Sequence, residues 1–287
     1  MNGKRWMALL LALVMSFSLL ACGAKPAENT GDNSQNTAAD GTTRVFTDSC
    51  GREVTVPVNV EKVAISGPLT QVYAIPLVGD LMVGVSNYIA EDISLYLPDY
   101  ISELPELGQL YGGKGELNLE TLLQSGAQVV IDVGESKGSI KEDMDSLQQQ
   151  TGIPFVHISA DMQSYPQAYR MLGNLLGMKT EAEALATYCE KIYSRTETIA
   201  SGVEKANVLY VTGDMGQNVI AKGSYHAEIL DMLTNNLAQM DEPSSKGTGN
   251  EVSMEQILTW NPDVVIFAPE SIYATVKDDA AWQSVTA

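Results

Sequence analysis

Short runs of β-branched and other apolar residues alternate with longer helix-like stretches along this chain, and no other feature limits its fold as strongly. Apolar runs separated by helices are typical of a mostly parallel sheet that is covered on both faces. We therefore predict an α/β fold with two Rossmann-like lobes, each built on a central, mostly parallel sheet. The runs that define the strands are Val63-Ala64-Ile65, Leu81-Met82-Val83, Val129-Val130-Ile131 and Phe155-Val156-His157-Ile158 in the first lobe, and Val208-Leu209-Tyr210-Val211 and Val264-Val265-Ile266-Phe267 in the second.

A long amphipathic helix is predicted between the two sets of strands. Apolar residues recur at three- and four-residue intervals from Ala182 to Ala200, and Thr180 followed by Glu183 fits a capping box at the start. About 22 residues at 1.5 Å each would extend roughly 33 Å, which is enough to link two lobes. A long helix within a single domain is the alternative interpretation. The expected divisions are an N-terminal lobe at 44–178, an interlobe helix at 179–204 and a C-terminal lobe at 205–287.

The composition excludes several classes of protein. Of the 287 residues, 45% belong to the hydrophobic set, which is enough for the cores of one large or two ordinary domains. With 17 Lys and Arg against 36 Asp and Glu, the formal charge is −19, and such a chain lacks the basic surface that binds nucleic acid. Three cysteines and two histidines cannot supply a disulfide framework or a structural zinc cluster.

The N-terminus has the features of a secretory signal. Lys4 and Arg5 precede an apolar run from Met7 to Leu20. This run is shorter than the roughly 18 to 20 residues that a membrane-spanning helix needs. We therefore expect a signal peptide at 1–21.

The residues at the end of this signal predict a lipid anchor. Leu19-Leu20-Ala21-Cys22 resembles the lipoprotein box of bacteria, in which cleavage before the cysteine leaves its thiol carrying a diacylglycerol. Two acyl chains give lasting attachment to a bilayer. Residues 22–43 then lack large apolar side chains and are expected to form a disordered tether. The expected location is the extracellular face of the cell membrane, on the periplasmic side if there is an outer membrane. An ordinary cleaved leader with an incidental cysteine is the alternative.

One helix-strand unit occurs twice in the chain, at a separation of 135 residues. Its first copy runs from Leu117 to Leu123 and is followed, after five residues, by Val129-Val130-Ile131. The second copy runs from Val252 to Leu258 and is followed, after the same interval, by Val264-Val265-Ile266. The two windows align without a gap, which predicts the same local structure in both lobes.

Each copy of this unit contains a helix cap and a glutamate. Asn118 and Ser253 are natural caps, and Glu120 and Glu255 follow in the first turn, where the helix dipole favours a negative charge. The glutamates either stabilise the starts of their helices only, or they form a matched pair on one outer surface. Their repetition in both lobes favours the pair.

The segment that follows the tether carries a family resemblance. Arg44 to Pro57 reads R-V-F-T-D-S-C-G-R-E-V-T-V-P, which predicts two short strands around a turn, and Val63-Ala64-Ile65 follows. This opening closely resembles that of the class III substrate-binding proteins of bacterial ABC importers, which capture ferric siderophores, haem or vitamin B12. The resemblance extends to the end of the chain and includes the E-x-L-L and E-x-I-L helices, the bridging helix and N-P-D-V-V-I at 261–266.

The resemblance implies a function and its partners. Family members hold a ligand in a cleft between two lobes that one rigid helix joins, and they deliver it to a permease dimer with its ATPase. Glu120 and Glu255 match the positions at which one glutamate on each lobe meets arginines of the permease. A monomer that binds a small-molecule metal chelate is expected.

The chain departs from the family pattern at its end. Family members usually continue past the W-x-x-V-x-A segment, here Trp282 to Ala287, with a further strand and helical cover. The resemblance therefore implies that the chain is a fragment or that its second lobe is unusually open. In either case, we expect the second lobe to be truncated relative to the family.

Ligands of open α/β sheets lie at the carboxyl ends of the strands, and the loops there supply the candidate site. Tyrosines in these loops offer flat apolar area with a hydroxyl, and lysines would meet an anionic chelate; ordinary packing and solvation are the alternatives. The residues chosen as ligand-binding are Tyr88, Tyr111, Lys137, Met215, Tyr225 and His226. The loops considered are Ser66 to Leu69, Asn87 and Tyr88, Tyr111 to Lys114, Glu135 to Lys137, Asp214 and Met215, Lys222 to His226, Ser244 to Asn250, and Glu270 and Ser271.

The few histidines and cysteines predict no metal site of the protein's own. His157 lies in an apolar strand and is expected to be a satisfied core residue. Two histidines are too few for a receptor of free zinc or manganese, so any metal is expected only as part of the bound chelate, and no cofactor is expected. Cys50 and Cys189 are treated as unpaired.

The residues leave the ligand open. A ferric chelate is the first choice by family frequency, followed by cobalamin, haem and oxyanions such as molybdate. An anchored sensor on the same scaffold is an alternative without a transport role. We recognise no catalytic motif such as G-x-S-x-G and no acid-base pair among the dispersed carboxylates, and we do not expect an enzyme; a secreted enzyme is the lesser alternative.

Overall fold

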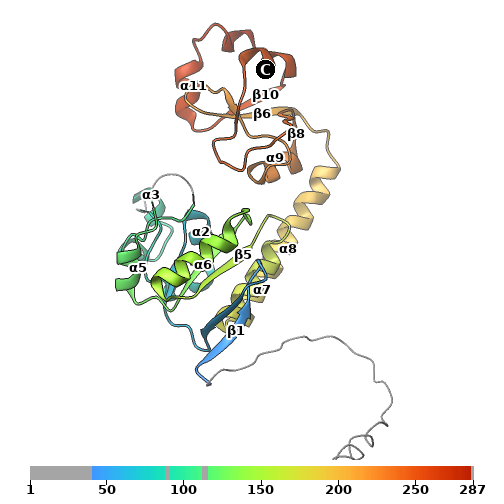
Figure 1. Ribbon diagram of the computed structural model, residues 1–287. Coiled ribbons are helices and arrows are strands. Elements are labelled where there is room, and N and C mark those ends of the chain that lie inside the picture. Colours follow the sequence, from blue (N-terminus) through green and yellow to red (C-terminus); the bar gives the residue numbers. More distant parts are fainter. Residues whose placement is uncertain (1–40, 88–90, 112–115, 286–287) are drawn as a thin grey trace, which may run out of the picture. The chain divides into compact units, whose positions relative to one another are not determined.

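The computed structural model describes residues 41–87, 91–111 and 116–285, all of which lie in one compact unit, Asn36–Ala287. The described chain begins with an antiparallel pair, β1 (Thr43–Thr47) and β2 (Glu53–Pro57) (Figure 1). The turn between them is organised by Asp48, whose Oδ1 accepts hydrogen bonds from the N–H groups of Cys50 and Arg52, both at 2.9 Å. The two short strands expected around a turn are therefore confirmed.

The first lobe is built on a parallel sheet in the order β3-β4-β5, with β3 at Val63–Ile65, β4 at Val129–Gly134 and β5 at Phe155–Ser159. Successive strand residues point to opposite faces, and each face has its own hydrophobic cluster. One cluster holds buried residues of α2 (Pro68–Val78), α7 (Tyr165–Leu176) and α8 (Lys179–Ser201). The other holds those of α5 (Leu119–Ser125) and α6 (Ile140–Thr151), so the sheet is covered on both sides.

The strand expected at Leu81-Met82-Val83 is wrong. This segment begins with the last residue of the 3-10 helix η1 (Gly79–Leu81), and only Met82 pairs with the sheet, through an isolated bridge to Val63. Its apolar side chains reflect burial, since Met82 is 5% exposed and lies in the core without a strand around it. The short helices α3 (Glu91–Ser94) and α4 (Asp99–Ser102) follow.

The long helix expected over 179–204 spans Lys179–Ser201, but its expected capping box is wrong. The N-cap is Met178, which makes no side-chain capping bond. Glu183 instead accepts hydrogen bonds from Arg170, at 2.8 Å from Nε and 2.7 Å from Nη2. A contact with another helix thus holds the carboxylate that the capping box would have used.

The second lobe has a mixed sheet in the order β10-β6-β7-β9, with β8 also paired to β6. The pairs β6–β10 and β6–β8 are parallel, and the two pairs of β7 are antiparallel. Its core contains Leu209, Val211, Ile257 and Trp282. The strands are β6 (Asn207–Thr212), β7 (Asn218–Val219), β8 (Asn235–Asn236), β9 (Asn250–Glu251) and β10 (Val264–Phe267). The helices are η2 (Tyr225–Ala227), α9 (Glu228–Leu233), α10 (Met254–Trp260), α11 (Glu270–Val276) and η3 (Trp282–Ser284).

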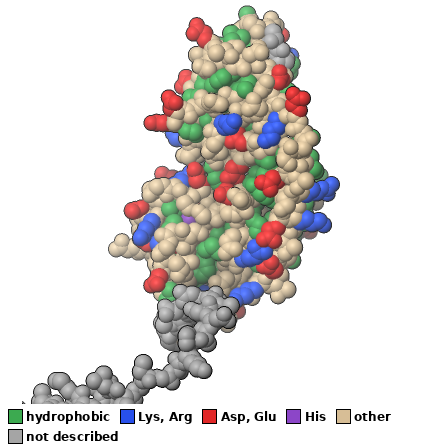
Figure 2. Space-filling model, turned by 90° about the vertical axis from the view of Figure 1, so that its right-hand side faces the viewer, with side chains coloured by type: hydrophobic (Ala, Val, Ile, Leu, Met, Phe, Trp, Pro, Cys, Tyr) green, Lys and Arg blue, Asp and Glu red, His purple; other side chains and the backbone are tan. Residues whose placement is uncertain are grey.

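These elements form the α/β fold that the apolar runs predicted. Acidic and basic side chains are interspersed over the face drawn in Figure 2, where no basic stripe is visible. Among the helices that the structure describes, none combines the length and the apolar character needed to cross a membrane.

Candidate ligand-binding site

A chain of hydrogen-bonded side chains lies at the carboxyl ends of β4 and β5. Asp132 on β4 and His157 on β5 are direct partners in the parallel register, and Asp132 Oδ2 lies 2.7 Å from His157 Nδ1. His157 Nε2 lies 3.0 Å from the Oγ of Ser136, which is itself hydrogen-bonded to the hydroxyl of Ser159. On the other side, Ser66 after β3 donates to Asp132 Oδ1. His157 is 0% exposed, so the expectation of a satisfied core histidine is confirmed, although its ring also bonds a surface serine.

The expectation that no G-x-S-x-G motif is present is wrong, and this motif marks the chain of side chains. Gly134-Glu135-Ser136-Lys137-Gly138 reads G-x-S-x-G between the end of β4 and the start of α6. Ser136 is exposed, whereas Asp132 is 7% exposed. The motif identifies the serine; the neighbouring strand that supplies the histidine follows only from the sheet order.

Two of the predicted ligand residues, Tyr111 and Lys137, lie together beside this chain. Lys137 Nζ lies 4.7 Å from the centre of the Tyr111 ring, which is a cation-π contact. The Tyr111 hydroxyl donates a 2.6 Å hydrogen bond to Asp143 Oδ2 at the start of α6. Burial, together with this hydrogen bond, raises the pKa of Tyr111, so its hydroxyl remains a donor at neutral pH.

Tyr225 extends from η2 toward the same strand ends. Its hydroxyl donates a 2.9 Å hydrogen bond to the carbonyl oxygen of Ala160, which follows β5. A Cβ placed on Gly134 would lie 3.7 Å from this hydroxyl, so the Tyr225 ring reaches the beginning of the G-x-S-x-G turn. Burial raises the pKa of Tyr225 and keeps its hydroxyl protonated.

Glu228 makes a second contact with the loop after β5. Its Oε2 accepts a 2.7 Å hydrogen bond from the N–H group of Met162. Burial raises the pKa of Glu228, and the hydrogen bond from Met162 opposes this shift. Tyr225 and Glu228 therefore both attach the start of the η2–α9 segment to main-chain atoms of residues 160–162.

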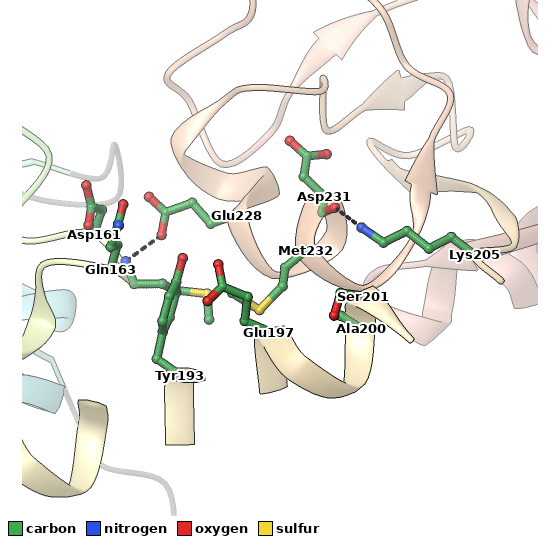
Figure 3. Close-up of a pocket in the computed structure, with 11 residues that line it drawn as sticks. Asp161, Gln163, Tyr193, Glu197, Ala200, Ser201, Lys205, Glu228, Asp231 and Met232 are labelled. Carbon is green, nitrogen blue, oxygen red and sulfur yellow. Dashed lines mark hydrogen bonds between the residues drawn. The ribbon is translucent and has the colours of Figure 1, made fainter. Parts of the chain in front are cut away.

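A cavity of about 480 Å³ adjoins these contacts (Figure 3). It is lined by the loop after β5, the second half of α8 and the helix α9, and Glu228 forms part of its lining. In Figure 3, the Lys205 side chain points toward α9, where its Nζ donates a 3.1 Å hydrogen bond to the Asp231 carbonyl oxygen. None of the residues predicted to bind ligand lines this cavity.

The other predicted ligand residues are distributed over separate loops. Met215 is 47% exposed, and its carbonyl oxygen accepts a 3.0 Å hydrogen bond from Trp282 Nε1. His226 is exposed, and its Nε2 lies 3.3 Å from the carbonyl oxygen of Ser245, in the loop that precedes β9. Tyr88, Lys114 and Cys22 lie outside the described residues.

In the described part of the chain, no three His, Cys, Asp or Glu side chains gather in a way that could hold a metal ion. Cys50 and Cys189 are free, as expected. Burial raises the pKa of both thiols, so neither has the low-pKa character of a reactive cysteine.

The repeated helix-strand unit forms as predicted in both lobes. Asn118 caps α5 by accepting a 3.0 Å hydrogen bond from the N–H group of Thr121, and Ser253 caps α10 by accepting one of 3.2 Å from that of Gln256. Glu120 and Glu255 each lie in the first turn that follows and are exposed. Both side chains are therefore available to a partner.

Comparison with known proteins identifies the family. Residues 71–287 match the family model described as periplasmic binding protein. None of the curated proteins matches the chain. An ABC transporter solute binding protein from Sulfurospirillum deleyianum has a TM-score of 0.71 at 24% identity, with 83% of this chain and 76% of that chain covered. The molybdate-bound MolA of Haemophilus influenzae has a TM-score of 0.67 at 17% identity, with 84% and 79% covered. The petrobactin-binding protein YclQ from Bacillus subtilis has a TM-score of 0.60 at 15% identity, with 85% of each chain covered.

The chain belongs to the periplasmic binding protein family, because the family model covers most of its length. Among the solved structures that share this fold is a solute binding protein of an ABC transporter. The resemblance to class III substrate-binding proteins is thereby confirmed.

Proposed function

We propose that this protein captures a ferric siderophore or a similar iron chelate and delivers it to the permease of an ABC importer. The matched pair of glutamates is the observation that supports delivery to a permease. Glu120 and Glu255 occupy equivalent positions on two capped helices, and both are exposed. Two equal charges, one from each lobe, suit a receptor that itself has two related halves. Charged pairs of this kind set orientation and association rate, with coupling energies of about 1.5 to 7 kcal/mol for close interfacial pairs.

Reversing both charges tests the delivery. The double variant Glu120→Lys, Glu255→Lys should abolish uptake in cells and leave ligand affinity nearly unchanged. The control is Glu181→Lys, Glu204→Lys, which makes the same change in net charge at two exposed positions, one in the first turn of α8 and one in the loop after its end. Normal uptake by the first variant would contradict the assignment and would favour a sensor. An equal loss of uptake in both double variants would show that net charge, and not these two positions, causes the effect.

The iron chelate is supported by the groups at the end of β4. Tyr111 and Lys137 form a cation-π pair there, and the Tyr225 ring reaches the same turn. A chelate that binds iron through catecholate oxygens is a large anion with flat aromatic surface, and aromatic rings with a cation suit such a ligand. The petrobactin-binding protein of Bacillus subtilis shares the fold.

Tryptophan fluorescence identifies the ligand class. Trp260 and Trp282 both lie in the second lobe, and Trp282 holds the carbonyl of Met215 in a candidate loop. Titration with a ferric siderophore, haem, cobalamin and molybdate should give the strongest saturable quenching with the ferric siderophore. The variant Tyr111→Ala, Lys137→Ala should weaken that binding, whereas Lys141→Ala, an exposed cation on α6, should not. If only another of these ligands gives saturable quenching, that ligand replaces the iron chelate in the proposed function.

We also propose that the lipid anchor is on Cys22. The motif Leu19-Leu20-Ala21-Cys22 supports it. A Cys22→Ser variant should be released from cells into the medium or periplasm, whereas the unaltered chain should remain with the membrane fraction. Equal membrane association of both chains would exclude acylation at this residue.

A further inference from the structure

Asp132, His157 and Ser136 have the arrangement of a hydrolytic triad. The two distances that define it are 2.7 Å from Asp132 Oδ2 to His157 Nδ1 and 3.0 Å from His157 Nε2 to Ser136 Oγ. Both fall within the range in which a nucleophile, its base and the group that orients the base act together. The acid and the base are buried, and the serine is exposed, so only the nucleophile faces a ligand.

The hydrogen bonds also determine where the protons lie. An ionised carboxylate only accepts hydrogen bonds, so Asp132 requires the proton of the neutral imidazole to be on Nδ1. The lone pair of Nε2 then faces Ser136, whose hydroxyl donates to it. Ser136 Oγ accepts in turn from Ser159, and Ser66 donates to the second oxygen of Asp132. Every member of the chain is satisfied in the protonation state that general-base catalysis needs.

The turn that carries Ser136 joins β4 to α6, as the nucleophile turn does in hydrolases with this motif, but Ser136 itself lacks a strained, positive φ. Gly134, the first residue of the G-x-S-x-G motif, has φ of 147°, and a Cβ there would lie 2.8 Å from Leu69 Cδ2. The backbone conformation therefore requires glycine, whereas the exposed end of the Leu69 side chain could move aside. Within the described ranges, the N–H groups of Ser136 and Lys137 bond no main-chain acceptor. Amides beside the nucleophile are the donors that stabilise an oxyanion in enzymes with this motif.

We propose that Ser136 is an activated nucleophile and that the first lobe hydrolyses a carboxylic ester presented at the carboxyl end of β4. The Oγ of Ser136 attacks the ester carbonyl carbon and forms a C–O bond with it. At the same time, the proton of the Ser136 hydroxyl passes to His157 Nε2. The ester C–O bond then breaks, and the departing alkoxide takes that proton and leaves as an alcohol. A water molecule, deprotonated by His157, releases the carboxylic acid and restores Ser136. Asp132 orients the ring and balances the charge of the imidazolium, and so it is a positioning residue. This activity uses the turn that also carries Lys137 of the proposed ligand site, but it does not depend on delivery to a permease.

Labelling with a fluorophosphonate tests the nucleophile directly. The Oγ forms an O–P bond, fluoride leaves, and His157 takes the proton. Mass spectrometry of the full chain should locate the adduct on Ser136, and Ser136→Ala should abolish it. The matched control Ser139→Ala removes another exposed hydroxyl, three residues away at the start of α6, and should label normally. Absence of an adduct on Ser136, or equal labelling of Ser136→Ala, would overturn the proposal.

Hydrolysis of p-nitrophenyl butyrate tests turnover. The unaltered chain should release p-nitrophenol above the buffer rate, and Ser136→Ala and His157→Gln should each lose at least about 100-fold of this excess. A rate unchanged in Ser136→Ala would contradict the mechanism. If circular dichroism shows that His157→Gln does not fold, the rate of Ser136→Ala alone decides whether the mechanism holds. The Glu120→Lys, Glu255→Lys variant should hydrolyse the ester normally, so that a failure of transport and a failure of this proposal remain distinguishable.

The role of Asp132 has a spectroscopic test. The chain has two histidines, so ¹⁵N spectra with His157 and His226 assigned by substitution report the tautomer of each ring. His157 should be protonated on Nδ1, and Asp132→Asn should lose this tautomer together with ester hydrolysis while His226 is unchanged. Retention of the Nδ1–H tautomer in Asp132→Asn would contradict the positioning role.

Discussion

The two copies of the helix-strand unit have the same local structure but differ in burial. Leu122 on α5 and Ile257 on α10 are equivalent, and both are 0% exposed. On the strands that follow, Val129 is 0% exposed, whereas its equivalent Val264 is 44% exposed. The reason is that β4 lies between β3 and β5, whereas β10 lies at the end of its sheet with β6 as its neighbour. A repeated sequence therefore reproduces caps and turns, but the elements around each copy decide how far its strand is buried.

The largest effect is expected from an aspartate placed on each strand. Val129→Asp buries an unpaired charge and should lower the free energy of unfolding by about 3 to 5 kcal/mol. Val264→Asp keeps its charge in contact with water and should cost less than about 1 kcal/mol. Urea unfolding followed by circular dichroism measures both. Equal losses would mean that β10 is as enclosed as β4 in solution.

Truncation of the buried helix residues should remove the difference between the two copies. Leu122→Ala and Ile257→Ala should each destabilise by about 2 to 5 kcal/mol, because both leave a cavity in a closed core. Urea unfolding followed by the fluorescence of Trp260 and Trp282, both in the second lobe, should respond most strongly to Ile257→Ala. A loss below 1 kcal/mol at either position, by circular dichroism, would show that its core is not closed.

The helix caps should contribute equally. Asn118→Ala and Ser253→Ala each remove the side chain that accepts an N–H group of the first turn and should cost about 1 kcal/mol. The variants Asn118→Asp and Ser253→Asp keep an acceptor and should retain most of the stability. Thermal unfolding of the four variants provides the comparison, and a cost confined to one lobe would contradict the equivalence of the caps.

The smallest effect is expected at the ends of the same helices. Gly126 ends α5 with φ of 69°, and its equivalent Asn261 ends α10 with φ of 47°. Asn261→Gly relieves a conformation that costs side-chain-bearing residues energy and should stabilise by less than about 1 kcal/mol, whereas Gly126→Ala should destabilise by about 1 kcal/mol. Thermal unfolding tests both signs. A destabilising Asn261→Gly would show that the asparagine side chain contributes more than the backbone does.

Local chemistry explains what the sequence predicted correctly. The apolar runs that became β3, β4 and β5 and the caps at Asn118 and Ser253 depend on neighbours within a few residues. The capping box predicted at Thr180 and Glu183 is wrong because α8 begins before Thr180, and Glu183 binds Arg170 on the preceding helix instead. The strand predicted at Leu81-Met82-Val83 is wrong because a buried segment can be apolar without forming a strand.

The candidate site was less predictable because its contacts cross between elements. The sequence predicted Tyr111 and Lys137 as two separate ligand-binding residues, and only the structure shows that they form a pair. Ser136 and His157 lie 21 positions apart and meet because β4 and β5 are adjacent. The G-x-S-x-G motif was readable from the sequence, but the acid and base that give it meaning depend on strand register.

The contacts of Tyr225 and Glu228 with residues 160–162 end on a carbonyl oxygen and an N–H group. Main-chain atoms are the same in nearly every amino acid, so this loop is free to change its side chains during evolution while both attachments persist. Proline at position 162 is the exception, since it has no N–H group to donate. Descendants of this protein should therefore vary widely at Met162 yet avoid that one residue.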